Sequence, residues 1–313
     1  MSGASVVELG QGRQMLDLHF RDHEGLIAAF LVPGEDGWTL LETGPTTCRP
    51  SLLAALPAAG VDPTEVRRVL VSHIHLDHAG GVGALARSLP RATFYVHERG
   101  VKHLVDPSRL IASARRAWGP AADPLWGEIV PVPADRLVSV VGGERIPVTG
   151  GDLEVLATPG HASHHVSFFD HPTRSMFTGD SAGVFVEGLA RPRPAVPPPE
   201  LDLDLLFSSL EKMAALDPRR LFFTHFGPGE DAVPLLHEYR RTVERWRDVA
   251  LAAARTEPTV ERVGRALRDL ESQAMDSARP PTSTEDRSSL VSGYELAAQG
   301  FLRYFETHGL LSG

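Results

Sequence analysis

Short apolar runs, bounded by glycine, proline and charged residues, alternate with helical stretches from about residue 14 to residue 230. The runs rich in β-branched and aromatic residues predict strands, because such side chains pack well on a pleated surface. These runs are LIAAFLV, WTLLET, VRRVLVSH, ATFYVH, LEVLATPG, HVSFFD, RSMFTGD and RRLFFTH. Strands interleaved with helices predict a layered α/β domain. Several runs end in His or Asp where the chain turns, so we expect the chemistry along one sheet edge.

Two segments interrupt this rhythm. Residues 99–130 contain a predicted helix around LIASARRAW, between Pro107 and Pro120, and are interpreted as an insertion. Residues 184–203 include RPRPAVPPPE, in which repeated proline removes backbone donors and fixes φ. The second segment is therefore predicted to be an extended loop, with a rigid surface connector favoured over a lid on the site.

Beyond residue 230 the pattern becomes helical, with apolar residues spaced three and four apart. One predicted helix carries Leu236, Tyr239, Val243, Trp246 and Ala250, and a second carries Val260, Val263, Leu267 and Leu270. After Pro280-Pro281, a capping box at residues 282–285 predicts a last helix with Tyr294, Ala297, Phe301 and Tyr304 on one face. We interpret Tyr294 and Tyr304 as core residues rather than as the lining of an acyl pocket. The expected organisation is a core over residues 1–230 and a helical extension over residues 231–313 packed on it.

Composition narrows the possible functions. The chain has 313 residues, of which 42% are apolar, and this is enough for a substantial core. A formal charge of -9 argues against a nucleic-acid partner, because phosphate binding needs clustered cations. Neither a secretory signal nor an apolar run of the ~20 residues that span a membrane is present. We therefore expect a cytoplasmic protein with a small-molecule substrate and no membrane partner, and leave a homodimer open.

Cys48 is the single cysteine, so any metal must rely on histidine and carboxylate ligands.

The segment VSHIHLDHAGG concentrates candidate ligands. His73 and His75 lie two residues apart on a predicted strand, which places both imidazoles on one side. Asp77 and His78 follow, at the first turn of a predicted helix that includes Gly80-Gly81. Imidazole combined with carboxylate suits zinc, iron or manganese better than calcium or magnesium. The pattern therefore predicts a metal site.

This segment resembles the signature motif of the metallo-β-lactamase superfamily, and the resemblance extends over roughly residues 20–230. TPGH ends a strand with His161, FTGDS ends another with Asp180, and FFTHFGP ends a third with His225. The resemblance implies an α/β fold of the four-layer αββα sandwich type, here with a C-terminal helical extension.

The resemblance also implies a metal site with two divalent ions, expected to be zinc, with iron or manganese as alternatives. By that resemblance His73, His75 and His161 hold one ion, Asp77, His78 and His225 hold the other, and Asp180 bridges both. A hydroxide bridging the two ions then attacks an ester-like bond. Asp77 is also the candidate catalytic residue, orienting the nucleophile or carrying a proton, with pure ligation as an equal alternative. No substrate-binding residue is predicted.

Two positions depart from the family pattern. Glu42 stands where the family usually has the Asp of an Asp-Thr-Gly turn, and its longer side chain alters a hydrogen bond behind the ligands. His164 replaces a common glycine next to His165. We interpret His164 and His165 as supporting or structural residues rather than ligands.

Within the superfamily, zinc β-lactamases usually have Cys where this chain has Asp180 and are normally exported, which argues against antibiotic hydrolysis. The chain is more similar to glyoxalase II-like thioesterases and acyl-homoserine-lactonase-like enzymes. Hydrolysis of a carboxylic ester, thioester or lactone is therefore expected, although the lack of any lysine after Lys212 weakens the glyoxalase II interpretation. The alternatives are a phosphodiesterase or nuclease and an iron-dependent redox enzyme. A non-catalytic module is disfavoured because no ligand is missing.

Overall fold

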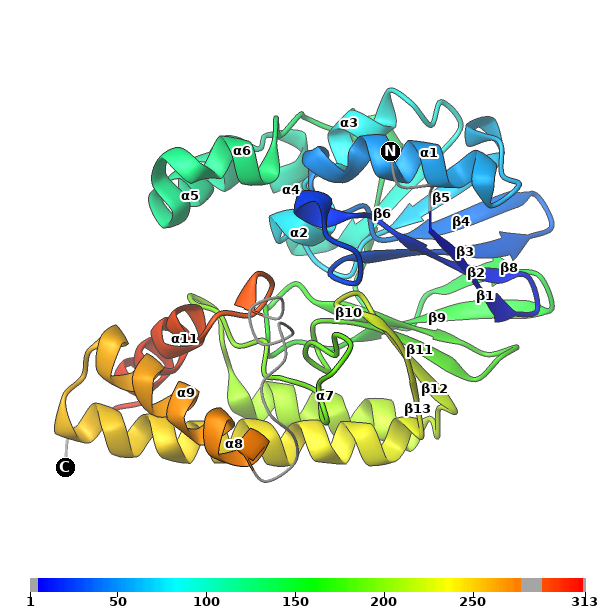
Figure 1. Ribbon diagram of the computed structural model, residues 1–313. Helices are drawn as coiled ribbons and strands as arrows, with labels where there is room; N and C mark the ends of the chain where they lie inside the picture. The colour runs from blue at the N-terminus through cyan, green and yellow to red at the C-terminus, as the bar shows by residue number, and fades with distance from the viewer. Residues whose placement is uncertain (1–4, 277–288, 312–313) are drawn as a thin grey trace.

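The computed structural model describes residues 5–276 and 289–311. The chain forms two β-sheets that face each other, with helices on both outer sides (Figure 1). The first sheet has the order β1-β2-β3-β4-β5-β6-β7 and the second has the order β13-β12-β11-β10-β9-β8. This arrangement, with helices at the C-terminal end, confirms the predicted αββα fold class.

The first sheet is antiparallel from β1 to β4 and parallel from β4 to β7. Its strands are β1 (Val6–Gly10), β2 (Arg13–Asp17), β3 (Ala28–Gly34), β4 (Gly37–Leu41), β5 (Val66–Leu70), β6 (Thr93–His97) and β7 (Leu137–Val140). The second sheet is antiparallel except for the parallel pair β11 and β12. Its strands are β8 (Arg145–Val148), β9 (Gly151–Ala157), β10 (Val166–Asp170), β11 (Ser175–Gly179), β12 (Arg220–Phe223) and β13 (Gly227–Glu230).

Aromatic rings fill the space between the two sheets. Phe30 of β3 lies 5.1 Å from Phe177 of β11 and 5.7 Å from Phe222 of β12, measured between ring centroids. All three side chains are buried together with Leu, Ile and Val from both inner faces. Burial of this apolar area holds the sheets face to face, and it leaves the strand ends free to carry polar residues.

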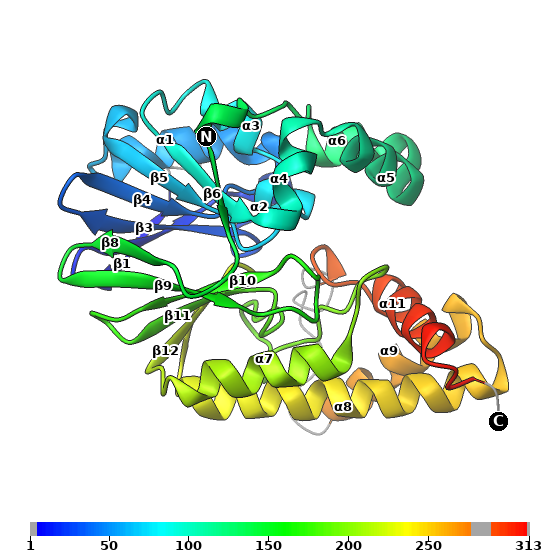
Figure 2. The same ribbon diagram turned by 180° about the vertical axis from the view of Figure 1, so that it is seen from behind.

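Helices connect the parallel strands of the first sheet; some lie on its outer face, and the last two project past the edge of the sheet (Figures 1 and 2). They are α1 (Arg49–Ala58), α2 (Leu76–Ala79), α3 (Val82–Ala86), α4 (Glu98–Val105), α5 (Ser108–Trp118) and α6 (Ala122–Trp126). The helix predicted between Pro107 and Pro120 is present as α5. Helices α4 to α6 connect β6 to β7, and a parallel pair of strands requires such a crossover.

The second sheet is covered by α7 (Leu203–Ala215) and α8 (Ala232–Thr256), and α8 extends past the sheet to pack against α9 (Val260–Asp276) and α11 (Tyr294–Thr307) (Figure 2). The apolar positions predicted for these helices lie in one buried cluster, which also includes residues of β11 and β12. Tyr294 and Tyr304 are core residues, as predicted.

The predicted domain boundary at residue 230 stays a prediction. Pro280-Pro281 and the predicted capping box at residues 282–285 lie outside the described residues. Nowhere in the described chain is a helix both long and apolar enough to pass through a bilayer.

The prediction of a surface connector at residues 184–203 is wrong for the middle of that segment. Residues 192–196 are buried, and Arg193 is only 5% exposed. An antiparallel bridge pairs Val184 with Arg193, and the Arg193 guanidinium packs on the Tyr294 ring. The helical extension therefore covers a segment whose proline content alone suggested solvent exposure.

A buried ion pair ties the two sheets together. The Arg13 guanidinium, on β2, contacts both carboxylate oxygens of Asp170, at the end of β10, at 2.9 and 3.1 Å. We expect Asp170→Asn to lower the free energy of unfolding by about 3 kcal/mol, because it leaves a buried guanidinium without its counter-charge. The matched control is Asp36→Asn, which breaks the exposed pair with Arg68 and is expected to change stability by at most ~1 kcal/mol. Equal urea midpoints for the two variants would contradict this account.

Candidate metal centre

The candidate ligands lie where strands of both sheets end. The prediction that His73 and His75 are part of a strand is wrong, because β5 ends at Leu70 and both residues lie in the turn before α2. The chain leaves the first sheet at Ser72, whose N–H donates to the Glu42 carboxylate and whose carbonyl accepts from Val166 of the second sheet. The tight turn, rather than strand alternation, brings the two imidazoles together.

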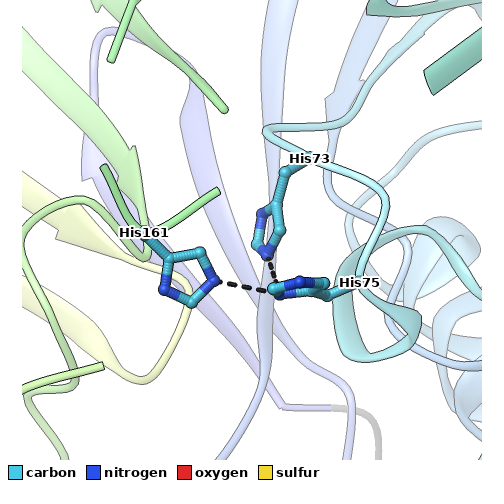
Figure 3. Close-up of side chains that lie close together, drawn as sticks. All are labelled: His73, His75 and His161. Atoms are coloured by element: carbon cyan, nitrogen blue, oxygen red, sulfur yellow. Dashed lines mark hydrogen bonds between the residues drawn. The ribbon is translucent and has the colours of Figure 1, made fainter. Parts of the chain in front are cut away.

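His73, His75 and His161 form the first ligand group (Figure 3). The Nδ1 atom of His75 lies 2.9 Å from Nε2 of His73 and 3.0 Å from Nε2 of His161. His73 and His161 are buried, whereas His75 is partly exposed. Three ring nitrogens from two distant parts of the sequence therefore face one point.

Hydrogen bonds on the far sides of the rings fix which nitrogen can bind a cation. Nδ1 of His161 lies 2.9 Å from the Ala195 carbonyl oxygen, and Nδ1 of His225 lies 2.8 Å from the Leu26 carbonyl oxygen. A carbonyl only accepts hydrogen bonds, so each Nδ1 carries the proton and each neutral ring presents the Nε2 lone pair. Those lone pairs point toward the other candidate ligands.

Asp77, His78 and His225 form a second ligand group next to the first. Nε2 of His78 lies 3.2 Å from Nε2 of His225, and the nearest Asp77 oxygen lies 3.5 Å from Nε2 of His225. Glu42 lies behind His78, with a carboxylate oxygen 3.3 Å from Nδ1. The negative charge of Glu42 therefore favours a proton on Nδ1 of His78; whether Glu42 changes the hydrogen bonding relative to the family's usual aspartate stays a prediction.

Asp180 lies between the two groups. Its Oδ1 is 3.2 Å from Nε2 of His78 and 3.6 Å from Nε2 of His225, while its Oδ2 is 3.4 Å from Nε2 of His161. The Asp180 N–H donates to Nε2 of His165 at 3.1 Å, which holds the residue in place. Each carboxylate oxygen faces a different ligand group, the placement expected of a bridging ligand.

The electrostatics of the site favour a bound cation. Burial, followed by the neighbouring imidazoles, lowers the pKa of His73 well below its usual value and that of His75 to about 3. Burial alone would raise the pKa of Asp180, but the adjacent His78, His161 and His225 outweigh it and hold that pKa well below normal. The histidines of the first group are therefore neutral donors next to an ionised carboxylate. Nitrogen and oxygen donors in this combination fit zinc, iron or manganese.

Other predicted residues have supporting positions. His165 contacts the hydroxyls of Thr158 and Ser181, both at 2.9 Å, in agreement with the structural role predicted for it. The His164 ring lies 5.9 Å from the His75 ring and 3.9 Å from the Glu200 carboxylate, and it belongs to neither ligand group. Sequence reasoning missed the carbonyls that orient His161 and His225, since a backbone acceptor carries no residue-type signal.

One cavity, of about 480 Å³, adjoins the segment that carries His225. It is lined by Phe226 and by Gly25, which neighbour His225 and its partner Leu26 in the sequence. Its charged lining residues are Asp17, Glu24 and Glu187, and its lining, as far as the chain is described, contains no lysine or arginine. The cavity is therefore acidic and partly apolar.

Comparisons with known proteins identify the family of this chain. The family model described as the metallo-beta-lactamase superfamily matches residues 24–225. A metallo-beta-lactamase fold-containing protein of Sulfurisphaera tokodaii is 29% identical over 162 residues, which are 51% of this chain and 60% of that relative. A hydroxyacylglutathione hydrolase of Pseudomonas putida is 29% identical over 243 residues, which are 76% of this chain and 68% of that relative. The crystal structure of a metallo-beta-lactamase family protein from Thermus thermophilus matches 99% of this chain and 95% of its own, with a TM-score of 0.67 at 19% identity.

Substitutions of the candidate ligands should show which residues hold metal in each of the two groups. We expect His75→Ala to remove metal from the first group only, and Asp180→Asn to weaken binding at both, because its two oxygens face different groups. Metal content per chain, measured by elemental analysis after dialysis at a fixed free-metal concentration, tests this. If the Asp180 variant keeps two ions per chain and full activity, the bridging assignment is wrong.

Metal removal should also lower thermal stability. A ligand that binds only the folded state at a thousand times its Kd stabilises that state by about 4 kcal/mol, so chelation is expected to lower Tm by several degrees. Scanning calorimetry of the same preparation before and after chelation measures the shift, and readdition of zinc serves as the control. An unchanged Tm after confirmed metal loss would argue against ions bound at these residues.

Proposed function

This chain belongs to the metallo-β-lactamase superfamily, and we propose that it is a metal-dependent hydrolase that cleaves a carboxylic ester, thioester or lactone bond in a small molecule. One observation carries the proposal: five imidazoles and two carboxylates from distant segments converge into two adjoining ligand groups. A structural role alone would not require so many buried donors to face one another.

Each group would hold one divalent ion, and Asp180 would be a ligand of both ions. Ions bound there supply a lowered pKa for bound water and stabilise negative charge that develops on a carbonyl oxygen. The protein's own part is to hold the donors in fixed tautomers, through Ala195, Leu26 and Glu42, and to keep the site dry on its buried sides.

Asp77 is the proposed catalytic residue. Its side chain is 21% exposed, whereas those of Asp180 and His225 are 8% and 0% exposed. A carboxylate on the accessible side of the site can accept or deliver a proton where substrate and solvent arrive. Burial would raise its pKa, but the adjacent His78 and His225 outweigh burial and lower the pKa to about 2. The carboxylate is therefore ionised, and it is better suited to orient the attacking water by accepting a hydrogen bond than to remove its proton.

The name of one relative bears on the substrate class. The Pseudomonas relative is named for a glutathione thioester, which supports acyl transfer to water as the reaction. No lysine follows Lys212 in this chain, and such basic residues would suit the negatively charged glutathione. We therefore rank esters and lactones above a glutathione thioester.

A substrate panel tests the proposal with zinc-, iron- and manganese-loaded protein. We expect turnover of p-nitrophenyl acetate and of a lactone, weaker turnover of a glutathione thioester, and little turnover of bis-p-nitrophenyl phosphate. His75→Ala, prepared identically, should lose at least about a hundredfold in kcat/KM and is the control for contaminating activity. Strong phosphodiester cleavage with inert carboxyl substrates would favour a phosphodiesterase, and oxygen consumption by an iron form would favour a redox enzyme.

A further inference from the structure

We propose that the C-terminal helices position the metal ligand His161 through a buried strap, residues 191–197, and that metal binding and docking of these helices on the core are therefore thermodynamically coupled. The inference rests on the proposed metal site. It goes beyond that site by giving α8, α9 and α11 a role in metal affinity, although these helices contribute no residue to either ligand group in the described chain.

The strap contacts His161 directly. The Ala195 carbonyl accepts the hydrogen bond from Nδ1 of His161 at 2.9 Å and so presents Nε2 to the first ligand group. A hydrogen bond behind a ligand fixes ring orientation as well as tautomer, and its loss typically weakens metal binding by about 10- to 100-fold. The position of the Ala195 peptide therefore sets how well His161 can bind.

Tyr239 of α8 holds the other side of the same peptide. The Ala195 N–H donates to the Tyr239 hydroxyl at 3.4 Å, and Tyr239 is fully buried. The Tyr239 ring also lies against Gly183, where an added Cβ would come within 2.3 Å of a ring carbon. The Gly183 N–H donates to the Asp180 carbonyl at 3.0 Å. One side chain of the extension thus contacts both the strap that orients His161 and the turn that follows Asp180.

Further contacts of the strap come from α11 and the residues just before it. The Arg193 guanidinium lies 4.0 Å from the centre of the Tyr294 ring, a stacking contact between a cation and an aromatic face. The Ser292 hydroxyl donates to the Pro194 carbonyl at 2.7 Å. The backbone of α11 approaches so closely at Gly300 that a Cβ there would meet the Val196 carbonyl oxygen at 1.9 Å.

Helix α9 holds the beginning of the strap. Arg191 pairs with both carboxylate oxygens of Glu271, at 3.0 and 3.1 Å, and Glu271 also accepts from the Trp246 indole N–H at 2.8 Å. Trp246 is buried in the core of the extension. All three helices therefore contact the strap, so loosening of the helices would remove these contacts and leave the backbone bridge between Arg193 and Val184 to hold Ala195 against His161.

Coupling of this kind is reciprocal: if the docked helices raise metal affinity, bound metal stabilises the docked helices by the same free energy. The strap would then be the element through which metal binding affects docking of the helices and docking of the helices affects metal binding. The two directions can be measured separately.

Tyr239→Phe tests the first direction, because it removes the hydroxyl that accepts from Ala195 and keeps the ring. Zinc affinity, measured by competition with a chromophoric chelator, should fall about tenfold for one class of sites. Tyr304→Phe is the control, since it also removes a tyrosine hydroxyl from the helical extension, and the hydrogen bonds described for Tyr304 are accepted by its backbone carbonyl from Thr307 and His308 rather than from the strap. Its zinc affinity should equal that of the wild type. Equal affinities for Tyr239→Phe and wild type, or equal losses in both variants, would overturn the proposal.

Hydrogen–deuterium exchange of the wild-type protein tests the reverse direction and does not depend on a variant that folds. Zinc should slow exchange in the strap and in α11, which lies on it, relative to α1 on the opposite side of the sandwich. Unchanged exchange in the strap and α11 upon zinc binding would overturn the coupling while leaving the proposed hydrolase intact. A wild-type protein that binds no zinc, iron or manganese would overturn both.

Discussion

The structure depends on one electrostatic constraint: imidazoles with ring nitrogens directed at one another lie next to ionised carboxylates, in a place where water is largely excluded. Burial and the neighbouring imidazoles lower the pKa of His73 and His75. At His78 and His225, by contrast, burial is outweighed by Asp180 and the other carboxylates, which raise the pKa. His78 and His225 face each other across 3.2 Å through Nε2 atoms that both lack a proton when the rings are neutral. Such an arrangement is unfavourable unless a cation or a proton occupies the space between the donors. The surrounding fold therefore has to hold these groups together against their mutual repulsion.

The supports that do this are mostly backbone groups and buried carboxylates. Leu26 and Ala195 orient His225 and His161 through their carbonyl oxygens, and Glu42 orients His78. Glu42 has a positive φ of 66°, so the tight turn after β4 points its longer side chain at both Ser72 and His78. The two carboxylate oxygens of Glu42 face different partners: Oε1 accepts from the Ser72 N–H and Oε2 lies 3.3 Å from Nδ1 of His78.

The sequence predicted the parts of this arrangement that side-chain type encodes. The central strands and the helical faces follow from apolar periodicity, and the candidate ligands between His73 and His78 follow from the spacing of His and Asp. His161, Asp180 and His225 are assigned as ligands by the resemblance to the family. Strands β1, β2, β7, β8 and β13 were not predicted, because short, partly exposed strands such as β1 and β13 have little apolar signal. The burial of the Pro-rich segment was also missed, since it arises from long-range packing of Arg193 on Tyr294. Local composition cannot encode a contact between residues about a hundred positions apart.

The candidate ligands differ in how far their side chains are exposed to solvent. The donors that face the interior are held by the sheets and by the strap, whereas His75 and Asp77 are the partly exposed members on the accessible side. Because His75 and Asp77 are candidate ligands as well as the members nearest to solvent, we expect changes at either residue to alter metal binding together with access to the site. His164 and Glu200 also border this side, where the chain departs from the family pattern. The fold fixes the buried ligands, whereas residues on the accessible side can vary without moving them. We therefore expect residues such as His164 and Glu200, rather than the ligands, to decide which substrate is accepted.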